Sequence, residues 1–284
     1  MMARMPTISR REVLALGFRA SVVTAAAATA VSASRAALAT AAPPATSAAA
    51  PTYATGSFVS AARGGVPTNW IIARPPGQSV PLRPVILLHG KDSNAQTVMS
   101  MGAERFLADA VAAGLPPFAL AAVDGGNGYW HRRASGDDPG AMVLDEFLPL
   151  LGEQGLDTSR VGFLGWSMGG YGAMLLGARL GAPRTAAIVA VSPALWTSPG
   201  AAAPGAFDGA DDYNANSVWG LAGLNGIPLR IDCGYDDPFY SATKQFIAQL
   251  PTPPAGGFSP GGHNPAFWSS QLTAELSWAA PLLA

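Results

Sequence analysis

The stretch GWSMGG at residues 165–170 places Ser167 between two glycines, with a third glycine directly behind. A serine held on a sharp turn by small neighbours can act as a nucleophile in acyl transfer, provided that a base removes its proton. The chain has 33 glycines in 284 residues, so such a pattern can also arise by chance. The sequence on either side therefore has to show whether Ser167 is a nucleophile or belongs to a turn in which small residues merely pack.

Three histidines could supply the base. His89 ends an apolar run, His131 lies in the loop GYWHRRASG, and His263 lies in the glycine-rich stretch SPGGHNPAFW. Only His263 follows both the serine and a candidate acid, which is the chain order that accompanies a serine on a strand-to-helix turn. We therefore predict that His263 is the base, the alternative being a solvated loop side chain.

The acid that orients the base is expected in CGYDDPF, residues 233–239. Asp236 and Asp237 both follow an apolar run, and either carboxylate could hold the tautomer of the imidazole. Capping of the following helix is the alternative role for one of them. Asp232 lies within the run and is expected to point elsewhere, but the sequence pattern does not separate Asp236 from Asp237.

The oxyanion of an acyl-transfer intermediate needs hydrogen-bond donors. After a serine on a strand-to-helix turn, one donor is the backbone amide of the next residue, which is Met168 here. The second comes from the loop after an earlier strand, and Lys91, which follows VILLHG, is the candidate.

Alternating apolar runs and amphipathic segments predict the elements that position these residues. We expect buried strands at 84–90, 118–126, 160–167, 186–193 and 228–237, and helices at 97–114, 140–152, 168–180 and 241–250. Two earlier runs, GSFVSAA and NWIIAR, are expected to form an antiparallel edge. This alternation predicts one α/β domain over residues 56–284, with a mostly parallel central sheet and helices on both faces. The candidate residues then lie beyond the carboxyl ends of the strands, where ligands bind in such sheets.

Several of these segments together resemble a known family. VILLHG, AAVDGGNGYW, LDEFLPLL, GWSMGGYGAM, CGYDDPF and GGHNPAFW occur in the order found in the esterase D and S-formylglutathione hydrolase group of α/β-hydrolases. That group also includes feruloyl esterases and secreted mycolyltransferases. The resemblance covers most of residues 84–268 and implies the α/β-hydrolase fold. It also implies an acid directly before the proline, which selects Asp237, and it supports His263 and the amides of Met168 and Lys91.

Other residues give weaker signals. Tryptophans and a tyrosine near the expected catalytic edge could line a substrate pocket, although aromatic residues are more often part of the core: Trp130, Trp166, Trp268, Trp196 and Tyr171. The acidic cluster FDGADDYN lacks the spacing of a calcium loop, so a solvated loop is expected. The histidine spacing does not match a zinc site, and we expect no metal and no cofactor. Cys233 is expected to be a buried, inert strand residue.

The N-terminus has the composition of an export signal. Residues 1–39 contain the pair Arg10–Arg11, an alanine-rich apolar run and a small-residue cleavage site that ends at Ala39, as in a twin-arginine signal peptide. Arg19 interrupts the run, so no stable membrane span is expected. Residues 40–55, rich in alanine and proline, are expected to form a flexible leader.

Removal of this segment leaves 12 basic and 17 acidic residues, a net charge of −5. Such a charge argues against nucleic acid as a partner. The sequence therefore predicts an exported serine hydrolase that acts on small-molecule, lipid or sugar esters. One alternative is an acyltransferase that moves the acyl group to a sugar or lipid hydroxyl, and another is an inactive secreted binding protein.

Overall fold

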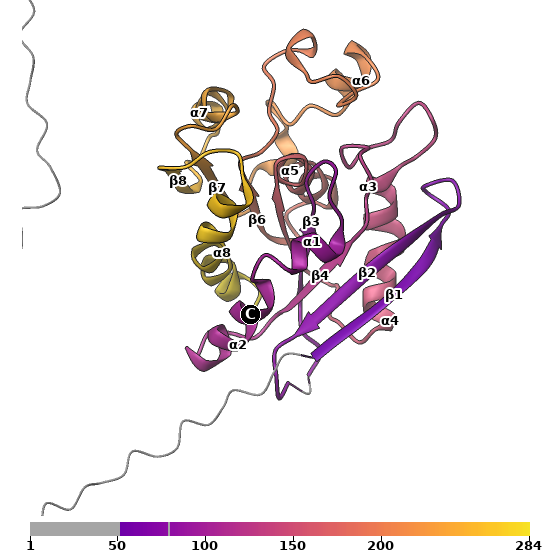
Figure 1. Ribbon diagram of the computed structural model, residues 1–284, viewed down its shortest axis with the longest axis vertical. Helices are drawn as coiled ribbons and strands as arrows, with labels where there is room; N and C mark the ends of the chain where they lie inside the picture. The colour runs from indigo at the N-terminus through magenta and orange to yellow at the C-terminus, as the bar shows by residue number, and fades with distance from the viewer. Residues whose placement is uncertain (1–51, 79) are drawn as a thin grey trace, which may run out of the picture. The chain divides into compact units, whose positions relative to one another are not determined.

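The computed structural model describes residues 52–78 and 80–284, and Figure 1 shows their arrangement around a central sheet. Within this part of the chain the sheet has eight strands in the order β1-β2-β4-β3-β5-β6-β7-β8. The predicted signal peptide at 1–39 and residues 40–51 of the predicted leader lie outside the described residues.

The sheet is parallel except at one edge. Strands β3 to β8 run parallel to their neighbours, whereas β1 pairs antiparallel with β2, and β2 pairs antiparallel with β4. The strands are β1 (Thr52–Ser60), β2 (Val66–Arg74), β3 (Pro84–Leu88), β4 (Ala119–Val123), β5 (Val161–Trp166), β6 (Thr185–Val191), β7 (Leu229–Gly234) and β8 (Ala255–Ser259). Every residue of β3, β4, β5 and β6 is buried, which is why these strands are continuous apolar runs without alternation.

Helices cover both faces of the sheet. On one face η1, α4, α5 and α7 pack against residues such as Ile86 and Phe163; on the other, α1, α2 and α8 pack against Val85 and Leu164. The helical segments are α1 (Ala95–Met99), α2 (Ala103–Ala112), α3 (Pro139–Ala141), η1 (Met142–Phe147), α4 (Leu148–Glu153), α5 (Met168–Leu180), η2 (Pro199–Ala201), α6 (Ala210–Ala215), η3 (Ala222–Leu224), α7 (Tyr240–Gln249), α8 (Pro265–Ala279) and η4 (Ala280–Leu282).

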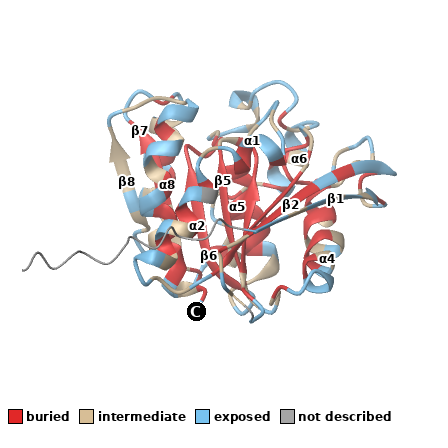
Figure 2. Ribbon diagram, turned by 60° about the horizontal axis from the view of Figure 1, so that its bottom comes forward, coloured by how far each residue is buried: buried red, intermediate tan, exposed pale blue. Residues whose placement is uncertain are grey.

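Figure 2 shows the burial that results, with buried strands flanked by helices whose outer sides are exposed. The predicted α/β class, with a mostly parallel sheet between two helical layers, is confirmed. Within the described residues, no helix is both long and apolar enough to cross a membrane.

The two edge strands of the sheet differ from the prediction. The predicted leader was assigned residues 40–55, but residues 52–55 belong to β1, where Thr52 pairs with Arg74 and Thr55 with Ile71. Strand β8 was not among the predicted strands, because its sequence, AGGFS, has two glycines and no apolar run. It nevertheless extends the sheet through backbone pairing with β7, from Arg230 with Ala255 to Gly234 with Ser259.

Two predicted helices are also divided. The segment 97–114 contains the end of α1 and all of α2, which are separated near Gly102, whose φ of 105° lies in a region that glycine adopts without strain. The segment 140–152 contains the π-helical η1 directly before α4. The wide turn lies just ahead of Pro149, which cannot donate a helical hydrogen bond.

The topology brings the candidate residues to one edge. Lys91, Ser167, Asp237 and His263 follow strands β3, β5, β7 and β8, which are all parallel, so their carboxyl ends lie along the same side of the sheet. This is the side at which α/β sheets bind ligands.

Candidate active site

Ser167 occupies a strained turn between β5 and α5. Its φ of 57° and ψ of −118° are unusual for a residue with a side chain. Such strain persists only where the surroundings impose it, and here the backbone is fixed on both sides. The Ser167 amide donates to the carbonyl of Val191, and its carbonyl accepts from the amides of Tyr171 and Ala194. The hydroxyl is thereby presented at the edge of the sheet.

The glycines around Ser167 are required by close backbone contacts. A methyl group on Gly165 would overlap the carbonyl of Gly169, and one on Gly169 would overlap the carbonyl of Leu88. Because these neighbours are backbone atoms, they cannot move aside as a flexible side chain would. The strand-to-helix turn predicted from GWSMGG is therefore present, and any larger residue at either glycine would force it open.

The structure brings Ser167, His263 and Asp237 into a single line of contacts. The Nε2 atom of His263 lies 2.9 Å from the Oγ of Ser167, and its Nδ1 lies 2.9 Å from the Oδ2 of Asp237. Since an ionised carboxylate only accepts, we assign the proton to Nδ1, which donates to Asp237. Nε2 is then free to accept the hydroxyl proton of Ser167.

Backbone contacts between two loops hold His263 beside the end of β7. The amide of Tyr235 donates to the carbonyl of Ser259, and the amide of Asp236 donates to the carbonyl of Gly261 at 2.9 Å. A side chain on Gly234 would overlap the carbonyl of Gly261, so glycine is needed for this approach. Strand β8, which the sequence reasoning missed, thus delivers His263 to Asp237.

Asp237 is the carboxylate that meets the imidazole. Its side chain is fully buried, and its Oδ1 accepts a 2.8 Å hydrogen bond from the Phe239 amide. Burial raises its pKa, but the opposing interactions, chiefly the hydrogen bonds from His263 and Phe239, together outweigh that effect and hold the pKa below its ordinary value. Asp236 is exposed, whereas Asp232 pairs with Arg230 at 2.6 Å and so points elsewhere, as predicted.

Two backbone amides near Ser167 are available as donors. Within the described residues, neither the Met168 amide nor the Lys91 amide donates to another protein group. Met168 is the first residue of α5, where the helix leaves its amides without intrahelical partners and carries a partial positive charge. The Lys91 side chain is half exposed and pairs with Asp92, so only its backbone is a candidate donor.

Aromatic side chains form a wall beside His263. Trp268 and Phe239 contact the imidazole edge to face, with ring centroids 5.1 and 5.3 Å away. Trp196 continues this wall from Phe239, at 5.5 Å, to Tyr129, at 5.8 Å. The sequence reasoning missed Phe239 and Tyr129, although Phe239 follows Asp237 by only two positions.

Two predicted substrate contacts need correction. Trp130 is fully buried, with its ring packed against Gly125 and Gly172, where a methyl group would collide with it. Trp166 is 1% exposed and belongs to the apolar cluster beneath α1 and α8. Both are core residues in this structure, whereas Trp268 is half-buried and contacts His263.

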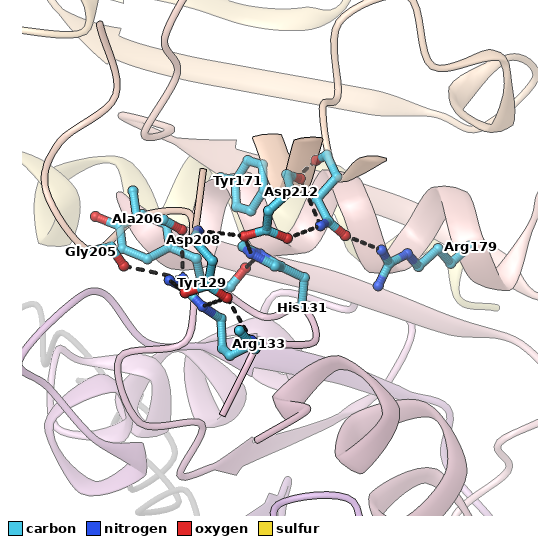
Figure 3. A network of polar contacts seen from close by, with 11 residues as sticks. Tyr129, His131, Arg133, Tyr171, Arg179, Gly205, Ala206, Asp208 and Asp212 are labelled. Atoms are coloured by element: carbon cyan, nitrogen blue, oxygen red, sulfur yellow. Dashed lines mark hydrogen bonds and ion pairs between the residues drawn. The ribbon is translucent and has the colours of Figure 1, made fainter. Parts of the chain in front are cut away.

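The remaining histidines lie inside the protein. His131 contacts the Tyr129 carbonyl through Nδ1 and the Asp212 carboxylate, at 3.2 Å, through Nε2. Figure 3 shows this network, in which Arg133 also forms two hydrogen bonds with Asp208. The acidic cluster FDGADDYN was expected to be a solvated loop. Asp208 is exposed and lies in an irregular segment, as expected, although its carboxylate pairs with Arg133. Asp212 departs from that expectation, because it lies in α6 and its half-buried carboxylate contacts His131.

Cys233 is fully buried in β7, as predicted, and burial raises the pKa of its thiol to about 12. Such a thiol is almost entirely protonated at neutral pH and is therefore a poor nucleophile. Among the described residues, no group of three or more histidine, cysteine, aspartate or glutamate side chains is arranged as a metal site.

Comparison with known proteins identifies the fold. No protein-family model matches the chain, and no curated protein matches it. Among solved structures, a ferulic acid esterase is similar with a TM-score of 0.71 and 21% identity, over 82% of this chain and 98% of that one. An S-formylglutathione hydrolase from Agrobacterium tumefaciens gives 0.70 and 19%, over 83% and 96%. A fluorophosphonate-binding serine hydrolase from Staphylococcus aureus gives 0.64 and 20%, over 82% and 99%.

These likenesses show that the chain has the α/β-hydrolase fold, as the sequence resemblance implied. The similar structures include both groups, esterase D-like and feruloyl esterases, that the motifs suggested. Because a fold supports many activities, the activity of this chain must be argued from its own site.

Proposed function

We propose that this protein is an exported serine esterase that hydrolyses carboxylic esters through an acyl-enzyme. The observation that carries the proposal is the contact chain from Ser167 through His263 to Asp237, with distances of 2.9 Å at both steps. Ser167 lies on a strained strand-to-helix turn, and the protein has an α/β-hydrolase fold. That combination matches what a serine nucleophile, its base and an orienting acid require.

The first half of the reaction follows from this geometry. The Oγ of Ser167 attacks the acyl carbon of the ester while Nε2 of His263 accepts its proton. The carbonyl oxygen becomes an oxyanion, to which the amides of Met168 and Lys91 donate. Each such donor typically stabilises the transition state by about 3 kcal/mol. The intermediate then collapses, the bond to the alcohol breaks, and His263 returns the proton to the leaving alkoxide.

Water completes the cycle by the same route in reverse. His263 removes a proton from water, whose oxygen attacks the acyl carbon, and the acid departs as Ser167 regains its proton. Asp237 stays ionised throughout, since its pKa is held below its ordinary value. Its role is to hold the imidazole in the Nδ1–H tautomer and to stabilise the imidazolium that forms.

The substrate class is a small-molecule ester. Support comes from the aromatic wall of Phe239, Trp268 and Trp196 beside His263, which offers apolar surface to an acyl or aryl group. It also comes from similar structures described as a ferulic acid esterase and an S-formylglutathione hydrolase. An acyl group transferred to a sugar or lipid hydroxyl would use the same acyl-enzyme.

Export through the twin-arginine route is supported by the N-terminal sequence, in which Arg10 and Arg11 precede an alanine-rich run and a small-residue cleavage site. Replacing both arginines with lysine should retain the protein in the producing cell, without changing the specific activity of the purified mature chain.

Incubation of the mature protein with p-nitrophenyl esters of increasing acyl length, with and without trehalose or glycerol, tests the proposed activity. We expect a burst of p-nitrophenol followed by steady release of free acid. A trehalose or glycerol ester as the main product would identify an acyltransferase instead. Tight binding of esters without any turnover would identify a binding protein.

A further inference from the structure

His89 is a fully buried polar side chain that the proposed reaction does not use. It directly follows β3, two residues before Lys91, so it lies at the start of the loop that carries one of the oxyanion donors. A buried imidazole needs hydrogen-bond partners on both ring nitrogens, and the structure supplies both.

The partners of His89 fix its protonation. The Gly125 amide donates to Nε2 at 2.8 Å, and because an amide can only donate, Nε2 carries no proton. Nδ1 lies 2.7 Å from the carbonyl oxygen of Gly90, which can only accept. The ring is therefore the neutral Nδ1–H tautomer, and Nδ1 donates to Gly90. Burial, the largest effect, lowers the pKa of His89, as does Arg63, whereas Asp124 and the contact with Gly90 raise it.

The Gly90 carbonyl and the Lys91 amide belong to one peptide group. This group is planar and trans, so the carbonyl and the N–H point in opposite directions. By holding the carbonyl of Gly90 on one side, His89 determines that the Lys91 N–H faces the other. A rotation of this peptide would turn the donor away from the substrate.

The same peptide lies against the nucleophile turn. A methyl group on Gly90 would sit 3.4 Å from the carbonyl oxygen of Trp166 and 3.7 Å from the Cβ of Ser167. On its other flank, the next amide, that of Asp92, donates to the side chain of Asn127 at 2.8 Å. Among the described residues, the Lys91 amide has no acceptor, and it lies between two fixed groups, the Gly90 carbonyl and the Asp92 amide.

We propose that His89 is a positioning residue, which aims the Lys91 amide at the oxyanion by holding the Gly90 carbonyl on the opposite side of their shared peptide. The inference rests on the proposed function of Ser167. It deepens that function by assigning a task to a second histidine, which neither touches the substrate nor transfers a proton.

Two isosteric substitutions separate this role from simple packing. An asparagine places its amide nitrogen at the position of Nδ1, two bonds from Cβ, and can still donate to Gly90. The side-chain amide of a glutamine reaches the position of Nε2. Its oxygen can accept from the Gly125 amide, but it has no donor at the position of Nδ1 for the Gly90 carbonyl. We expect His89→Asn to keep kcat within about tenfold of the wild type. We expect His89→Gln and His89→Ala to lose about 100-fold in kcat with little change in KM.

The affinity for a transition-state analogue would not change if His89 served only to pack the core. A trifluoromethyl ketone forms a hemiketal with Ser167 whose oxygen occupies the oxyanion position. Its affinity should fall with kcat across the three variants, in samples whose circular dichroism and thermal unfolding show that they are folded. Equal kcat for the asparagine and glutamine variants, or losses confined to KM, would overturn the inference.

The tautomer can be measured without any activity. Long-range ¹H–¹⁵N correlation spectra of the labelled protein at pH 7.5, with His89→Asn to identify the signals, should show the proton of His89 on Nδ1. A proton on Nε2, or on both nitrogens, would overturn the inference even in an active enzyme. In contrast, a wild-type protein that hydrolyses no ester and reacts with no fluorophosphonate counts against the proposed function itself.

Discussion

The described part of the chain contains two histidine–carboxylate pairs that differ in what surrounds them. In the His263–Asp237 pair the carboxylate is fully buried and the imidazole is 24% exposed, whereas in the His131–Asp212 pair the imidazole is fully buried and the carboxylate is 17% exposed. The ring nitrogen that does not contact the carboxylate is Nε2 in His263, where it lies beside the Ser167 hydroxyl. In His131 it is Nδ1, which lies beside the carbonyl of Tyr129.

This contrast shows that a histidine–carboxylate pair is not in itself an active site. His131 is fully buried and stacks on Phe207 with ring centroids 5.2 Å apart, so a substrate cannot approach it. Its partner Asp212 also accepts hydrogen bonds from the Asp208 amide and the Asn216 side chain. The contact between His131 and Asp212 ties α6 to the 129–133 segment. We interpret the His131–Asp212 pair as a structural contact and the His263–Asp237 pair as a catalytic one.

The largest effect is expected for the side chains that exchange the proton. Ser167→Ala and His263→Ala should each lower kcat for p-nitrophenyl acetate by about 10⁶-fold, as expected when a nucleophile or its base is lost. Because the two act as a unit, the double variant should lose no more than either single one. Ser269→Ala, at an exposed position of α8, is the matched control. Retention of more than a few per cent of activity by Ser167→Ala would place the nucleophile elsewhere.

The next largest effect concerns the two adjacent aspartates. Asp237→Asn should lower kcat by about 10⁴-fold, because the amide favours the wrong imidazole tautomer. Asp236→Asn, at an exposed position one residue earlier, should change kcat by less than about threefold. Steady-state kinetics of both variants provide the measurement, and the reverse ranking would mean that the acid is Asp236.

A smaller effect, on stability, is expected at the second pair. Asp212→Asn replaces one carboxylate oxygen with an NH₂ group, so one donor whose hydrogen bond the carboxylate now accepts would lose its acceptor. This loss should lower the free energy of unfolding by about 1–3 kcal/mol. The kcat of the folded variant should stay within about tenfold of the wild type. Urea unfolding and steady-state kinetics of the same samples separate the two outcomes. A loss of kcat as large as that of Asp237→Asn would remove the distinction between the pairs.

The smallest effect is a pH dependence of stability. Burial lowers the pKa of His131 from 6.5, and Arg133 lowers it further, although Tyr129 and Asp212 act in the opposite direction. Below pH 6.5 the unfolded chain therefore binds a proton that the folded protein excludes. The free energy of unfolding should fall with decreasing pH from 6.5 towards the folded pKa, by at most about 1.4 kcal/mol per pH unit for this group. Urea titrations of the wild type and His131→Gln check this, since the slope should decrease in the variant.

Much of the fold was predictable because buried parallel strands and amphipathic helices leave strong patterns. The turn at Ser167 and the choice of His263 followed from local glycines and from chain order. Strand β8 did not, because AGGFS has two glycines and no apolar run, although its backbone pairs with β7. The direction of Trp130 was also beyond the sequence, since its ring occupies the room that Gly125 and Gly172 leave. The choice of Asp237 required the family resemblance, because spacing alone leaves Asp236 equally placed.

The central claim is that His263 activates the hydroxyl of Ser167. The most direct test is to treat the mature protein with a fluorophosphonate and to locate the adduct by mass spectrometry of its peptides, beside the His263→Ala variant. The account predicts one stoichiometric adduct on Ser167 in the wild type and almost none in the variant over the same time. An adduct on another residue, or labelling of Ser167 that does not depend on His263, would contradict it.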